Sequence, residues 1–288
     1  MIASALPTAE TPFINGLWRT RDVDEHAACL REWEQSYDQL SPGSFQGVFE
    51  EFCFGKVQLF REQFNQTVHE RGIPWRGSRA IGVATAADGL GCFRGMVFGL
   101  DSIVDLQGGD ELDFRTPRQH EVVVAVVDAE ALGDYSRQVE HHDLPIRSAP
   151  NGLVAAAPLQ AARLRTLLTA VFASLRAAPQ LLAHEPMRKA LEQTVFGSVF
   201  EAIRAPCEQR PPSGQARRFI VARAREFMRD HIDEPISVED LCVHLGVSRR
   251  TLQYSFQDVL GLNPVRFLRA LRLNGARRTL KAADPKAG

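Results

Sequence analysis

The sequence predicts an α+β protein with a β-rich N-terminal sandwich or small barrel, a helical hairpin and an all-α C-terminal domain. Three observations predict this fold class. Residues 44–130 carry several short strand-like stretches separated by turn residues. Residues 155–204 change to helical spacing of apolar residues. A proline-rich segment at 205–214 then precedes a short helix, a glycine turn and a second short helix.

Length and composition are those of a soluble protein with two domains. The chain has 288 residues, of which 44% are hydrophobic and 24% charged, and its net charge is −1. The charge is uneven: residues 215–288 hold fourteen Lys/Arg against eight Asp/Glu, a net of +6, which indicates an anionic partner for this end. The longest clean apolar run, Val122 to Val127, is too short to cross a bilayer, so we expect a cytoplasmic protein without membrane contact.

The N-terminal region is expected to be mostly strands. A tail that contains Pro and Thr leads into a charged helical stretch at 24–37, and a period-2 pattern over 47–54 continues after a turn at Gly55-Lys56 into 57–60. Further strands are expected at 79–85, 92–100, 111–114 and 121–127. The pattern predicts a sandwich or barrel rather than a parallel α/β sheet.

Two amphipathic helices are expected between residues 155 and 204, with a proline break between them. Two roles remain open at this point. The helices either cover the β region or form a homodimer seam, for which the candidates are Leu167, Val171, Leu191 and Val195. We take 1–204 as one regulatory domain, 205–214 as a linker and 215–288 as a separate helical domain.

The segment after the linker has the signals of a helix-turn-helix. Ser237 followed by Asp240 resembles a capping box, and Gly246 stands where a tight turn between helices needs a positive φ. Ser248 can cap the next helix, which Gly261 ends. A capped helix projected in this way can enter the DNA major groove.

The second of these helices carries the predicted DNA-binding residues. Arg can pair with the guanine edge and Gln with the adenine edge, so outward-facing Arg and Gln side chains suit base recognition. The alternative is a generic helical hairpin with a polar face. The predicted site consists of Ser248, Arg249, Arg250, Thr251, Gln253 and Tyr254.

The segment from Ile236 to Leu280 resembles the first helix-turn-helix and the connecting helix of AraC/XylS-family transcription regulators. The resemblance is carried by Leu241, Gly246-Val247-Ser248, Leu252, Phe256, Gly261-Leu262-Asn263-Pro264 and Phe267-Leu268. Cys242 stands where the family usually has alanine. The resemblance implies double-stranded promoter DNA as partner, activation through RNA polymerase as a candidate second partner, and a cupin-like sensory domain with a small-molecule effector. Because this family has a second helix-turn-helix after the connector and only 282–288 remain here, we expect weak binding by one module, strengthened in a homodimer.

Other chemistry is not favoured by the sequence. The eight histidines form no metal-ligand pattern, and the five cysteines contain no CxxC pair. We therefore expect no enzyme, no catalytic residues, no cofactor and no metal, and no motif specifies a ligand. The alternative function is a cupin-like small-molecule binder or enzyme with an incidental helical tail. Phe45, Phe52 and Trp75 could line an effector pocket, although packing in the core is their expected role.

Overall fold

The computed structural model describes residues 13–144, 152–154, 157–204 and 214–282. The chain divides into two compact units, Met1–Gly133 with Leu144–Pro206 and Asp134–Asp143 with Cys207–Gly288. The expected linker at 205–214 lies outside the described residues except for Gly214. Each unit is described below by itself.

The first unit is a sandwich of two sheets, and all of their strand pairs are antiparallel. The larger sheet has the order β1 (Phe13–Thr20), β3 (Gly47–Phe54), β4 (Val57–Phe64), β11 (His120–Asp128), β6 (Ser78–Ala87), β9 (Ile103–Gln107) and β12 (Leu153–Val154). The smaller sheet has the order β2 (Glu34–Gln39), β5 (Val68–Ile73), β10 (Leu112–Arg115), β7 (Gly91–Phe93) and β8 (Met96–Phe98). This arrangement confirms the predicted α+β class with a β sandwich.

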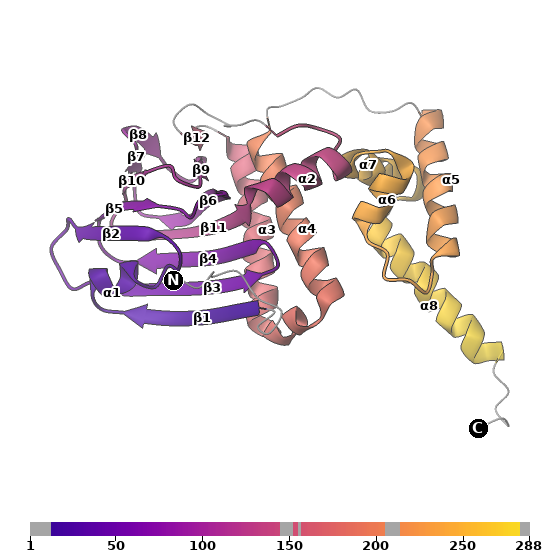
Figure 1. Cartoon of the computed structure of the whole chain (residues 1–288), viewed down its shortest axis with the longest axis horizontal. Helices are drawn as coiled ribbons and strands as arrows, with labels where there is room; N and C mark the ends of the chain where they lie inside the picture. Colours follow the sequence, from indigo (N-terminus) through magenta and orange to yellow (C-terminus); the bar gives the residue numbers. More distant parts are fainter. Residues whose placement is uncertain (1–12, 145–151, 155–156, 205–213, 283–288) are drawn as a thin grey trace. The chain divides into compact units, whose positions relative to one another are not determined.

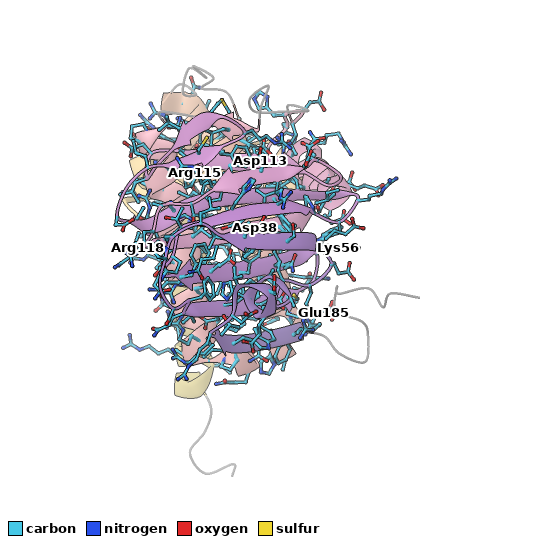
Figure 2. All side chains as sticks on the ribbon, turned by 90° about the vertical axis from the view of Figure 1, so that its left-hand side faces the viewer. Asp38, Lys56, Asp113, Arg115, Arg118 and Glu185 are labelled. Carbon is cyan, nitrogen blue, oxygen red and sulfur yellow. The ribbon has the colours of Figure 1, made fainter. Side chains whose placement is uncertain are left out.

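The core of this unit lies between the sheets because alternate side chains of each strand point inward. Phe49, Phe60 and Val124 of the larger sheet pack with Phe98 and Phe114 of the smaller sheet. The rings of Phe98 and Phe114 meet edge to face with centroids 4.9 Å apart. The outer face of the smaller sheet is instead charged and exposed, and its labelled members are Asp38, Asp113 and Arg115 (Figure 2).

Two ion pairs of this unit have the same length and opposite surroundings. Arg79 and Asp105 pair at 2.8 Å with side chains that are 6% and 1% exposed. Arg71 and Asp38 also pair at 2.8 Å, but their side chains are 51% and 57% exposed. Water screens the second pair and not the first, so only the first is expected to affect stability strongly.

Helices α3 (Pro158–Ala177) and α4 (Glu185–Ile203) lie side by side against the outer face of the larger sheet, joined by the 3-10 turn η1 (Pro179–Ala183) (Figure 1). Phe172 of α3 meets Phe52 of β3 edge to face at 5.6 Å. Val171 and Val195 are 6% and 0% exposed within the single chain. These two residues therefore do not belong to a dimer seam, and the alternative that the hairpin covers the β region is the better interpretation. Helical spacing identifies an apolar face but not its partner; the other two seam candidates, Leu167 and Leu191, are half-buried.

Two local expectations were also wrong. The helical stretch expected at 24–37 is limited to α1 (Val23–Ala27), which Asp22 caps, and β2 follows it. Gln35 and Tyr37 alternate on β2 and pair in register with β5, so backbone bonds to a neighbouring strand outweigh the charged composition. The strand expected at 92–100 is the hairpin of β7 and β8, because Arg94 and Gly95 turn the chain with φ of 46° and 77°.

The second unit is helical and contains α5 (Gly214–Asp230), α6 (Val238–Leu245), α7 (Arg249–Leu260) and α8 (Pro264–Ala282) (Figure 1). Helix α5 packs against both α6 and α7. Residues 134–143 also group with this unit; they include the C-terminal part of α2 (Ala129–Val139), a helix that the sequence did not predict. The core of the four helices contains Val221, Ala224, Met228, Leu241, Cys242, Leu252, Phe256 and Leu268.

Candidate functional site

The candidate nucleic-acid interface begins with the turn between α6 and α7. Ser237 and Asp240 form the predicted capping box: Ser237 Oγ accepts from the Asp240 backbone N–H at 3.2 Å, and Asp240 Oδ2 accepts from the Ser237 N–H at 2.7 Å. Gly246 ends α6 with φ of 61° and ψ of 36°. A side chain at this position would be strained in the left-handed conformation, so glycine fixes the angle at which the chain enters α7.

Helix α7 is held at both ends and along its inner face. Ser248 Oγ accepts from the Thr251 backbone N–H at 3.2 Å, and Gly261 ends the helix with φ of 69°. Leu252 and Phe256 are fully buried. The ring of Phe256 meets that of Phe267 on α8 at 5.7 Å, near edge-to-face geometry. Because this face is packed, the opposite face of α7 is fixed in orientation.

Three of the six predicted site residues lie on that opposite face. Arg250, Gln253 and Tyr254 are exposed, and Tyr254 retains 54% of its accessible surface. Their spacing of three and four residues puts them on neighbouring turns of one helix face. A guanidinium, an amide and a phenol on one projecting helix can reach base edges and phosphates together.

The other three predicted residues have local partners. Ser248 and Thr251 serve the helix cap, and their hydroxyls are 3.1 Å apart. Arg249 is half-buried, and its Nη1 donates to Tyr135 Oη at 3.3 Å within the C-terminal unit. Burial lowers the pKa of the Arg249 guanidinium, but Tyr135 and Glu140 more than offset this and leave the pKa raised. Sequence patterns could not predict this contact, because residues 135 and 249 are 114 positions apart in the chain.

The basic side chains of α8 differ in their surroundings. Arg266 and Arg269 are exposed. Arg272 donates through Nε to the Ile232 carbonyl at 3.2 Å and through Nη2 to the Glu234 carbonyl. Arg272 therefore fastens α8 to the end of α5, whereas Arg266 and Arg269 remain available to phosphates.

The β unit has an open hollow of about 740 Å³ at the ends of β1, β3, β4, β6 and β11. Its lining includes Arg19, Arg21, Gln63 and His120. His120 is 2% exposed, and neither ring nitrogen has a hydrogen-bond partner among the described residues. Burial lowers the pKa of His120 to about 4, although nearby Glu62 opposes the shift. His120 is therefore a neutral imidazole at pH 7.

A second, smaller cavity of about 60 Å³ lies between the two sheets. Its lining includes two buried acids, Glu62 and Glu70, that sequence reasoning missed. Local sequence did not indicate them, because Glu62 lies beyond the strand expected at 57–60 and no strand was expected around Glu70. Phe45, Phe52 and Trp75 line neither hollow. Phe45 and Trp75 pack against core clusters and Phe52 against α3, in agreement with their expected role.

The residues that the structure describes include neither a candidate membrane-spanning helix nor a cluster of metal ligands. No helix there is long and apolar enough to cross a membrane. No group of three or more His, Cys, Asp or Glu side chains there could hold a metal ion.

Comparison with known proteins identifies the C-terminal segment. Residues 241–287 match a family model described as a helix-turn-helix domain. The probable thc operon regulatory protein of Rhodococcus erythropolis is 39% identical over 66 residues, which are 23% of this chain and 20% of that protein. The regulator GbdR of Pseudomonas aeruginosa is 43% identical over 55 residues, which are 19% of this chain and 15% of that protein. The chain thus spans no more than about a fifth of these curated relatives.

Among solved structures, the AraC-like transcriptional activator CuxR aligns with 91% of this chain and 95% of its own, at 14% identity and a TM-score of 0.42. The C-terminal quarter of the chain is a helix-turn-helix domain of the kind found in transcription regulators. Its resemblance to the AraC/XylS type, first evident from residues 236–280, is confirmed at this segment.

Proposed function

We propose that this protein is a sequence-specific DNA-binding transcription activator whose β unit modulates DNA binding in response to a small molecule. The single observation that supports this most strongly is the exposed face of α7. Arg250, Gln253 and Tyr254 project from a helix whose caps and core are complete. A helix held this firmly presents its outer side chains at little entropic cost on binding.

The experiment is selection of bound sequences from random duplex DNA by the full chain. The selected site is then used to compare Arg250→Ala and Gln253→Ala with the unchanged protein. Each substitution should cost about 1–3 kcal/mol on the selected site and relax the preference at one base pair.

Two control variants match these changes. Arg229→Ala alters an exposed Arg on α5, and Gln180→Ala alters an exposed Gln in η1. Both controls should leave affinity and preference unchanged. If Arg250→Ala and Gln253→Ala bind the selected site as the unchanged protein does, the assignment of α7 as the reading helix is wrong.

We propose in addition that the regulator binds DNA as a homodimer, since the linked helix-turn-helix modules of two chains bind at high effective concentration. Light scattering at micromolar concentration measures this directly. A monomer would contradict the dimer and leave the assignment of α7 intact.

The second candidate function is a small-molecule binder or enzyme of the β unit alone. The two hollows of the β unit support small-molecule binding under both candidate functions. The salt dependence of nucleic-acid affinity separates the two candidates, because a DNA-binding protein releases counterions from phosphates and loses affinity steeply as salt rises.

A further inference from the structure

The smaller cavity of the β unit is lined mainly by apolar side chains, several of them aromatic. It lies between the two sheets and has a volume of about 60 Å³. One water needs about 10–15 Å³, so this cavity admits a ligand of a few heavy atoms. The aromatic members of its lining are Trp33, Tyr37, Phe60, Phe93, Phe98 and Phe114.

Two acids are among the residues that line this cavity. Glu62 on β4 and Glu70 on β5 are 3% and 5% exposed. No Lys, Arg or His is among the residues that line the cavity. The charge that its wall can develop is therefore negative only, which disfavours an anionic occupant.

The two acids differ in their neighbours. Glu62 Oε1 accepts from Tyr37 Oη at 3.0 Å and lies 3.0 Å from His26 Nε2, although that second contact is not aligned as a hydrogen bond. The Glu70 carboxyl group has no hydrogen-bond or ion-pair partner among the residues that the structure describes. Burial raises the pKa of Glu70 well above its usual value, and the neighbouring Glu62 raises it further.

A carboxyl group in such a place needs a positive partner to be ionised at neutral pH. The aromatic faces around it also attract cations. Two further polar atoms on the wall are buried without a hydrogen bond among the described residues: Gln35 Oε1 can accept from an N–H group, and Trp33 Nε1 can donate. An ammonium N–H would satisfy both the amide oxygen and the carboxylate.

We propose that the cavity between the two sheets binds a small protonated amine, with its ammonium group at Glu70 and Glu62 and its apolar part against the aromatic rings. This inference rests on the proposed function, because it names the chemical class of the effector that the β unit senses. The acid and the aromatic wall together select for positive charge, whereas shape alone would accept a neutral molecule of the same size.

Three probes that share a tert-butyl group test the selection. tert-Butylamine is protonated at pH 7.5, tert-butanol is neutral and pivalate is an anion. Thermal unfolding of the full chain is measured with each probe at the same millimolar concentration. The amine should raise the melting temperature by more than the alcohol does, and pivalate should have no effect. Equal shifts for the amine and the alcohol, or a larger shift for pivalate, would overturn the proposal.

Variants of single acids test whether the amine binds in this cavity. Glu70→Gln keeps the shape of the side chain and removes its charge, and it should weaken binding of the amine at least tenfold in calorimetric titration. Glu34→Gln makes the same change at an exposed position of β2 and should leave binding unchanged. Full amine affinity in Glu70→Gln would contradict the assignment. If Glu70→Gln does not fold, Glu62→Gln takes its place, and the three-probe comparison needs no variant.

The outcomes also separate this inference from the proposed function. Selection of DNA sites by the full chain uses no amine. Failure to bind the amine together with site-specific DNA binding rejects the effector class and keeps the regulator. Amine binding without site-specific DNA binding rejects the regulator and keeps the cavity as an amine site.

Discussion

Replacing Phe256 by alanine should destabilise the helix-turn-helix without affecting the β unit. Phe256 is fully buried between α7 and α8 and makes a ring contact at 5.7 Å with Phe267. Truncating a buried Phe to Ala costs about 3–5 kcal/mol, as apolar contacts are lost and a cavity remains. A helical unit of this size has a total stability of only about 4–10 kcal/mol. The loss is therefore a large part of what keeps the unit folded.

The chain supplies a matched control, because Phe219 on α5 is 67% exposed and can be changed to the same residue. Thermal unfolding followed by circular dichroism of the full chain is the assay. The transition of the helical unit should fall by at least about 12 °C in Phe256→Ala, since 1 kcal/mol shifts a small domain by about 4–8 °C. Phe219→Ala should shift it by a few degrees at most. Equal shifts in the two variants would refute the view that packing under α7 holds the recognition helix.

Three further predictions concern titration, ion pairing and the connector helix. His120 is neutral in the folded state, because burial lowers its pKa from 6.5 to about 4. The contribution of this residue to the free energy of unfolding is therefore present above about pH 6.5 and is lost, by about 3 kcal/mol, as the pH falls towards 4. Urea unfolding of His120→Phe should show a flatter dependence of stability on pH. Arg79→Met removes the partner of the buried Asp105 carboxylate and should lower the free energy of unfolding in urea by about 3–5 kcal/mol. The same change at exposed Arg71 should lower it by less than about 1 kcal/mol, and comparable losses in the two variants would contradict this ranking. Arg266→Ala and Arg269→Ala should each weaken binding to all DNA sequences alike and reduce the salt slope by about one, and a loss confined to one base pair would argue against phosphate contacts.

The helix-turn-helix was predictable because its signals are local. Ser237, Gly246 and Ser248 each determine the backbone within three residues, and the capping box and the left-handed glycine were found where the sequence predicts them. The hairpin of β3 and β4 was predictable for the same reason, since alternation and the turn at Gly55 are adjacent in the chain.

The features that were missed depend on distant partners. Strand β5 contains His69, Glu70 and Arg71, which obscure its alternation, and only pairing with β2 and β10 makes it a strand. The same charged Glu70 lies inside the sandwich. The contact of Arg249 with Tyr135 joins residues 114 positions apart. Propensity and periodicity describe single elements, whereas these features arise from which elements meet.

The Cys242 thiol can report local unfolding of the helical unit. This thiol is fully buried in α6, where burial raises the pKa to about 12. A thiol of this kind does not react with maleimides or peroxide while the helices are closed, because the reactive thiolate is almost unpopulated and inaccessible. Alkylation of Cys242 under native conditions therefore requires local unfolding, and its rate gives the free energy of that opening. Mass spectrometry of the labelled peptide can follow this opening with and without DNA, and no residue needs to be introduced.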